Sequence, residues 1–134
     1  MRAVKRRADR MLHALGELEA ELSVTLTDDA AIHVLNARHR KKAKPTDVLA
    51  FPMDESGPGP SGKMRLLGDV VISHETAQRQ ARARRHGLLD EVTFLLAHGL
   101  LHLLGYDHRT DAEERRMNEK ASRLVEAAVR RAGA

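Results

Sequence analysis

The 134-residue chain has no cysteine and no tryptophan, and its aromatic residues are limited to one tyrosine and two phenylalanines. Without cysteine, neither a disulfide framework nor a thiolate zinc site can form, so any metal must be held by histidine or carboxylate. Because aromatic residues are scarce, the core must be built from Leu, Val, Ile and Ala. For the same reason an RNA-binding surface would have few rings on which bases can stack.

The chain also lacks long apolar runs. None approaches the length of a membrane span, and the first residues lack the apolar core of a signal peptide. We therefore expect a cytoplasmic protein with no membrane partner. The length, with 42% hydrophobic and 31% charged residues, fits one globular domain over residues 1–134 with a single modest core.

The charge balance is basic and uneven. Twenty-three Lys and Arg residues face 19 Asp and Glu residues, giving a net charge of +4. The basic residues gather at Arg2–Arg10, Arg38–Lys44 and Arg79–Arg85. Such clusters suit a polyanionic partner such as nucleic acid, but solvated helix faces give the same pattern, so charge alone decides nothing.

Hydrophobic spacing predicts an α+β fold, with strands mostly in the first half of the chain and helices in the second. We expect a small mixed sheet of about three to four strands, packed with about five helices. Leu18 and Val34 are expected to face inward, and Gly87 is placed to end the third helix. The expected helices cover about 3–20, 30–40, 74–85, 88–104 and 110–131, and the expected strands 22–27, 46–53 and 66–73.

Residues 98–108, HGLLHLLGYDH, carry three histidines spaced four and then six apart. Four residues along a helix place His98 and His102 on one face, about one turn apart. Gly105 can take a left-handed conformation, which would end this buried helix and carry His108 back toward the same face. Three imidazoles leave one corner of a zinc tetrahedron open for water or substrate, as in catalytic sites. The spacing therefore predicts one zinc ion at the end of a buried helix.

The same spacing occurs in the metzincin proteases, but Gly99 stands where the protease has its catalytic glutamate. Glycine has no side chain to accept a proton, so the motif argues against ordinary peptide hydrolysis. Glycine inside a helix also costs about 1 kcal/mol relative to alanine. We interpret its presence as room for something bulky close above the metal.

These residues resemble the HGxLHLxGYDH signature of the YbeY endoribonucleases, the bacterial rRNA maturation factors. Two further blocks agree in the same order: Leu35-Asn36 with Arg40 followed by PTDVL at 45–49, and LGDVVIS at 67–73. The similarity covers roughly residues 20–125. Members of this family usually begin with a strand before the first helix. We expect that strand to be missing here, with either a truncated start or a smaller sheet.

The resemblance implies a zinc-dependent, single-strand-specific endoribonuclease in rRNA maturation and ribosome quality control, with the small ribosomal subunit as partner. It implies His98, His102 and His108 as zinc ligands and Arg40 as the functional arginine near the metal. A guanidinium binds two phosphate oxygens and stabilises the charge that grows in the transition state. The cationic residues expected to hold the flanking RNA backbone are Lys41, Lys42, Lys44, Arg82, Arg84 and Arg85.

Two other functions remain open at this stage. One is a metal-dependent peptidase or amidohydrolase that takes its base from elsewhere, and Gly99 weighs against it. The other is a non-catalytic RNA- or ribosome-binding assembly factor with structural zinc, and the open coordination corner weighs against that. Met117 is expected in the core of the last helix and His74 on the surface. The sequence names no general base, cleavage site, product ends or oligomeric state.

Overall fold

The computed structural model describes residues 1–40, 47–52, 65–106 and 109–129, without the side chains of residues 39 and 40. Within these ranges it has five helices and a three-stranded sheet, which confirms the α+β class. In chain order the elements are α1 (Arg2–Ala14), β1 (Ala20–Thr27), α2 (Asp29–Arg40), β2 (Val48–Pro52), β3 (Arg65–Ser73), α3 (His74–Arg84), α4 (Leu88–Leu103) and α5 (Asp111–Val129).

The sheet is mixed, and β3 is its central strand. It pairs in parallel with β1, where Val24 lies opposite Val70, and antiparallel with β2, where Leu49 lies opposite Val71. The register shifts at residues 21–22 of β1, opposite residues 66–68 of β3, so β3 carries one additional residue there. The spatial order is β1-β3-β2.

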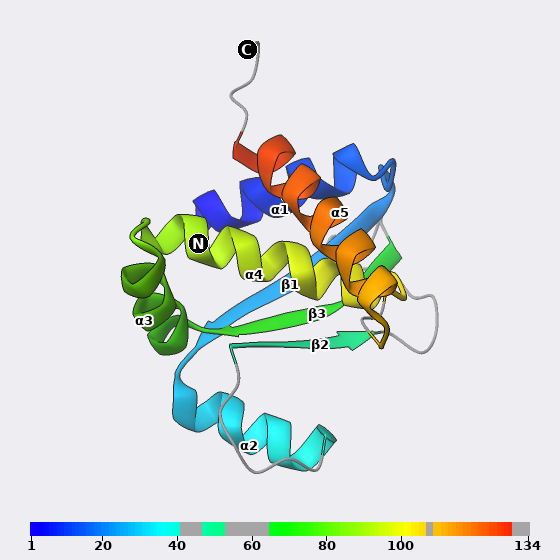
Figure 1. The fold of residues 1–134 in the computed structure, drawn as a ribbon. Coiled ribbons are helices and arrows are strands. Elements are labelled where there is room, and N and C mark those ends of the chain that lie inside the picture. Colours follow the sequence, from blue (N-terminus) through cyan, green and yellow to red (C-terminus); the bar gives the residue numbers. More distant parts are fainter. Residues whose placement is uncertain (41–46, 53–64, 107–108, 130–134) are drawn as a thin grey trace.

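The two faces of the sheet are covered unequally. Figure 1 shows α2 on one face and α1, α4 and α5 on the other. Side chains alternate along β3, so Val71 packs on the α2 side with Ile32 and Leu49. Val70 and Ile72 point the opposite way into the larger core formed with α1, α4 and α5. The main core therefore lies between the sheet and α4.

Helix α4 is the centre of this core, with nine of its 16 residues buried. Gly99 lies where α4 approaches the sheet: a Cβ atom there would sit 2.7 Å from Val70 Cγ1 and 3.3 Å from Val48 Cγ2. Glycine is therefore required because two strands pack against this turn of the helix. The sequence-based explanation, a bulky group close above the metal, is wrong for this reason.

Helix α1 ends earlier than expected, and two residues predicted to face inward are exposed. The helix was expected to reach residue 20, but Gly16 takes φ +76° and the Glu17 N–H donates to the Leu12 carbonyl at 2.9 Å. As a result, Leu18 lies beyond the helix and is 61% exposed. Val34 is likewise 53% exposed on α2, so both inward-facing predictions are wrong.

Helix α3 ends at an arginine, although a glycine was expected to end it. Arg85 adopts the left-handed conformation (φ 58°), and the His86 N–H donates to the Ala81 carbonyl at 3.1 Å. Gly87 instead occupies the N-cap position of α4. The chain therefore passes from α3 to α4 in a short turn, which brings the basic end of α3 against the start of α4.

Three other predictions about the helices agree with the structure. The Glu113 N–H donates to Thr110 Oγ1 at 3.1 Å, which confirms the cap of α5. Met117 is buried in the main core, and His74 is exposed at the start of α3. No helix within the described ranges is long and apolar enough to cross a membrane.

Candidate metal centre

The candidate metal centre lies at the C-terminal end of α4, where the chain reverses. Gly105 takes φ +95°, its N–H donates to the His102 carbonyl, and the Tyr106 N–H donates to the Leu101 carbonyl, both at 3.0 Å. This pair of bonds is the Schellman arrangement, which satisfies the last carbonyls of a helix. The reversal predicted at Gly105 is thereby confirmed.

His98 and His102 are both partly exposed and lie four residues apart on α4, which confirms that they share one helical face. His98 Nδ1 is 2.9 Å from the Phe94 carbonyl oxygen. Because a carbonyl only accepts hydrogen bonds, Nδ1 is the donor in this bond, and Nε2 is the ring nitrogen that is not tied to the helix backbone. That Nε2 lies 3.4 Å from Asn118 Oδ1 of α5. His98 is thus oriented by its own helix, as ligating imidazoles usually are.

The third expected ligand, His108, lies outside the described residues. Within the described ranges, no group of three His, Cys, Asp or Glu residues is arranged to hold a metal ion. The described part of the chain therefore contributes two of the three expected ligands, and zinc binding stays a prediction. The donor chemistry fits zinc: two imidazoles stand on a buried helix, one of them with its Nδ1 tied to a carbonyl.

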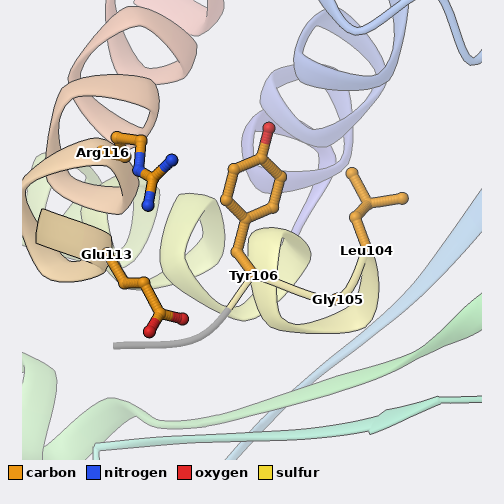
Figure 2. Close-up of a pocket in the computed structure, with 5 residues that line it drawn as sticks. All are labelled: Leu104, Gly105, Tyr106, Glu113 and Arg116. Atoms are coloured by element: carbon orange, nitrogen blue, oxygen red, sulfur yellow. The ribbon is translucent and has the colours of Figure 1, made fainter. Parts of the chain in front are cut away.

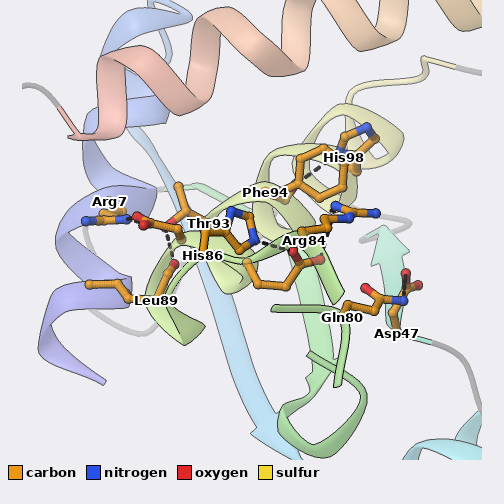
Figure 3. A network of polar contacts seen from close by, with 11 residues as sticks. Arg7, Asp47, Gln80, Arg84, His86, Leu89, Thr93, Phe94 and His98 are labelled. Atoms are coloured by element: carbon orange, nitrogen blue, oxygen red, sulfur yellow. Dashed lines mark hydrogen bonds and ion pairs between the residues drawn. The ribbon is translucent and has the colours of Figure 1, made fainter. Parts of the chain in front are cut away.

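A polar network joins the start of α4 to His98, and the sequence analysis missed it (Figure 3). The fully buried Glu91 accepts from His86 Nε2 at 2.6 Å and lies 3.2 Å from Arg84 Nη1. The Arg84 guanidinium stacks 4.4 Å from the Phe94 ring centroid. The Phe94 ring in turn lies 4.4 Å from the ring of His98. The available signal was the acidic pair Asp90-Glu91 at the start of the apolar segment 88–104, and Glu91 is the residue of this pair that is buried.

Arg40 is the last residue of α2, and its side chain lies outside what the structure describes. Figure 1 shows α2 and α4 ending toward the same side of the molecule, on opposite faces of the sheet. The role of Arg40 beside the metal stays a prediction.

The expected RNA-backbone contacts fall into two groups. Lys41, Lys42 and Lys44 lie outside the described residues. Arg82, Arg84 and Arg85 gather at the C-terminal end of α3 and are exposed. Of these three, only Arg84 makes an ion pair with a described residue. Contact with RNA stays a prediction for all six.

An open pocket of about 300 Å³ lies beyond the reversal, where the end of α4 faces α5. Figure 2 shows Glu113 and Arg116 projecting from α5 on one side, and Tyr106 with the end of α4 on the other. Sequence analysis missed this pocket because its lining comes from the loop after α4 and from the first turns of α5. The lining residues are Leu104, Gly105, Tyr106, Glu113 and Arg116.

A second polar cluster ties α2 to α3, away from the histidines. Asp29 accepts hydrogen bonds from Ser73 Oγ, from Thr76 Oγ1 at 2.6 Å and from Arg79 Nη2 at 2.8 Å. The bonds from Ser73 and Thr76, followed by that from Arg79, lower the pKa of Asp29 to about 2. The Asp29 carboxylate is satisfied by donors from within the fold, so we assign this cluster a structural role.

Comparison with known proteins places the chain in a family. The model of the family described as endoribonuclease YbeY matches residues 2–128. The endoribonuclease YbeY of Aquifex aeolicus (strain VF5) is 52% identical over 111 residues, covering 83% of this chain and 71% of that protein. The endoribonuclease YbeY of Anaeromyxobacter sp. (strain Fw109-5) is 48% identical over 126 residues, covering 94% of this chain and 64% of that protein.

The fold agrees with this relationship. The solution structure of TM1509 from Thermotoga maritima matches with a TM-score of 0.64 and 25% sequence identity, over 95% of this chain and 81% of that one. This chain spans between 64% and 71% of the length of the two relatives named above. Since the family match runs from the start of α1 to the last turn of α5, the chain belongs to the endoribonuclease YbeY family.

Proposed function

We propose that this endoribonuclease depends on one zinc ion held by His98, His102 and His108, and that it cuts single-stranded ribosomal RNA. The observation that carries the proposal is the state of His98. Its Nδ1 is bound to the Phe94 carbonyl, and its Nε2, whose one contact is the long 3.4 Å approach to Asn118 Oδ1, lies on the partly exposed face of a buried helix. Histidines that bind a metal through one ring nitrogen usually donate the other N–H to a carbonyl or carboxylate, and His98 has this arrangement.

The chain's own residues would hold the reacting groups in place. His98 and His102 stand on α4, which is fixed by its packing against β3, so their positions are set by the core of the protein. When bound, zinc supplies Lewis acidity toward a phosphoryl oxygen and increases the acidity of a neighbouring water. We propose that the Arg40 guanidinium binds two oxygens of the scissile phosphate and stabilises their growing charge.

Charge at the surface supports RNA as the substrate. The chain is basic overall, and the exposed residues Arg82 and Arg85 make no ion pair or hydrogen bond with described residues through their side chains. Such free guanidiniums bind backbone phosphates without regard to sequence, and RNA affinity should then fall as salt is added. A ribosomal substrate within the small subunit, and a cytoplasmic location, are proposed from the family resemblance.

Gly99 supports RNA cleavage over peptide hydrolysis. Position 99 is buried, and a Cβ there would point into Val70 of the sheet. A glutamate side chain at this position would therefore clash with Val70 in the core. The nucleophile in RNA cleavage is either water or the 2′-hydroxyl of the substrate, and the ends of the products distinguish the two.

The test is cleavage of matched substrates by one preparation of the protein. Single-stranded RNA, the same sequence as a duplex, and an unfolded protein are incubated with the enzyme, with chelator, and with chelator followed by zinc. We expect cleavage of single-stranded RNA alone, lost with chelator and restored by zinc. Protein cleavage would favour a peptidase. Zinc-dependent RNA binding without cleavage would favour an assembly factor.

A further inference from the structure

Among the phenylalanine and tyrosine side chains, Tyr106 presents the most exposed ring. The chain has only three aromatic residues. Phe94 is held between Arg84 and His98, and Phe51 packs against the small core on the α2 side of the sheet. Tyr106 is 38% exposed and lines the pocket between the end of α4 and α5. The most exposed of these three rings therefore lies four residues beyond the candidate ligand His102.

The pocket around this ring is built from fixed parts. The backbone of Tyr106 is held by its hydrogen bond to the Leu101 carbonyl. The Glu113 carboxylate accepts from Thr110 Oγ1 at 3.2 Å, the same hydroxyl that caps α5. Arg116 follows Glu113 by three residues and so shares its face of the helix. An aromatic ring, a carboxylate and a guanidinium thus converge on one space (Figure 2).

The guanidinium of Arg116 is available to a ligand. It makes no ion pair with Glu113 or with any other residue in the described ranges. A pocket of about 300 Å³ lies at the lower end of the size of small-molecule sites, so it suits one nucleotide rather than a length of strand. The polar groups are few and distinct, as expected of a site that selects its ligand.

We propose that this pocket binds one base of the RNA substrate, stacked on Tyr106, and that it selects guanine. A carboxylate only accepts hydrogen bonds, and guanine is the base with two adjacent donors, N1–H and the 2-amino group. Guanine also offers the acceptors O6 and N7, which arginine binds in pairs. The proposal rests on the proposed function only in taking RNA as the substrate. In this proposal Tyr106, Glu113 and Arg116 determine which nucleotide of the RNA binds beside the metal centre.

The single tyrosine allows a direct test in the metal-free protein. Protein grown with 3-fluorotyrosine carries one fluorine label, on Tyr106, and so gives one ¹⁹F resonance for the pocket. Chelator-treated protein is titrated with guanosine, adenosine, cytidine and uridine monophosphates, and with ribose 5-phosphate. We expect guanosine monophosphate to shift the resonance with at least roughly tenfold higher affinity than the others. Ribose 5-phosphate is expected to leave it unchanged.

Two charge-removing variants, each with an adjacent control, assign the selectivity. Glu113→Gln keeps the size and the cap of α5 but loses the acceptor pair, and its preference for guanine should fall roughly tenfold. Arg116→Gln should weaken binding of guanosine monophosphate by a similar factor. The neighbouring exposed residues provide the controls, Glu114→Gln and Arg115→Gln, which should bind as the unmodified protein does.

Three outcomes would overturn the inference. If no nucleotide shifts the resonance, the pocket does not bind a base. If ribose 5-phosphate shifts the resonance equally, the pocket binds the phosphate and not the base. If all four nucleotides bind with equal affinity, the pocket does not select guanine. None of these affects the zinc proposal, because the titration contains no metal. Conversely, RNA cleavage that survives removal of zinc would refute the metal proposal and leave the nucleotide titration standing.

Discussion

The polar side chains at the two ends of α4 differ in their burial and in their partners. At the N-terminal end, Glu91 is fully buried, and its carboxylate is held by His86 and Arg84. At the C-terminal end, His98 and His102 are partly exposed, and His98 makes one short bond, to a carbonyl of its own helix. Both ends belong to one continuous, largely buried helix.

The difference shows how one helix can serve both stability and chemistry. A buried charge must be paired within the fold, because leaving it unpaired costs several kcal/mol. A histidine at the surface has no such requirement, and its second nitrogen can be reserved for a ligand. We therefore expect substitutions at the first end to change stability and substitutions at the second to change metal binding and catalysis.

The largest effect is expected for His102→Ala. Loss of one of three zinc ligands should remove the metal and lower RNA cleavage by more than about 100-fold. Because His102 is partly exposed, the free energy of unfolding of the metal-free protein should change by less than about 1 kcal/mol. Zinc content, cleavage and urea unfolding are measured on one preparation, with the exposed His74→Ala as control. Full zinc content in His102→Ala would exclude it as a ligand.

Arg40→Ala should separate catalysis from metal binding. We expect zinc content to stay at one ion per chain while cleavage falls by about 10²–10³-fold, the usual loss when one donor to a transition state is removed. The comparison is with Arg38→Ala, two residues earlier on α2 and exposed. If both variants cleave RNA at the unmodified rate, Arg40 has no part in the site.

Glu91→Ala tests the stabilising end of α4. Loss of the buried carboxylate should lower the free energy of unfolding by about 2–3 kcal/mol, less than for a wholly buried pair because Arg84 and His86 can turn to solvent. Zinc stoichiometry should not change. The neighbouring Asp90→Ala removes an exposed carboxylate paired with Arg7 at 3.2 Å and should cost at most about 1 kcal/mol. Equal stability of the two variants would contradict the assigned difference between them.

The smallest effect concerns Asp29, a third carboxylate held by partners. The pKa of Asp29 is about 2 in the folded protein, against an ordinary value of 3.8. The ionised carboxylate therefore makes its full contribution to the free energy of unfolding above about pH 4. That stability is lost as the pH falls from about 4 toward 2, because the unfolded chain takes up the proton first. Asp29→Asn should flatten the pH dependence of urea unfolding in this window. The exposed Asp9→Asn serves as control, and identical curves for all three proteins would contradict the assignment.

Much of the local structure could be predicted because it depends on neighbouring residues. The reversal at Gly105 and the cap at Thr110 follow from short-range chemistry that the sequence displays directly. The end of α3 was misjudged because Arg85 accepts a left-handed conformation that glycine adopts more readily. Gly99 was misread because its reason lies in Val70, far away in the chain.

For the candidate site, too, the features that depend on neighbouring residues could be predicted and those that depend on packing between helices could not. The histidine spacing gives a shared helical face, since it depends only on the period of the helix. The contacts of Glu91 and the pocket at Tyr106 depend on how α3, α4 and α5 pack together, which no local pattern records. The parallel pairing of β1 with β3 is another long-range choice of this kind.

The central claim is that the C-terminal end of α4 holds one zinc ion. An anomalous-scattering map, collected on either side of the zinc absorption edge from crystals of the zinc-loaded protein, tests it most directly. We predict one peak per chain, in contact with His98, His102 and His108 and present only above the edge. A zinc-loaded crystal with no peak at these residues, or with its peak elsewhere, would contradict the account.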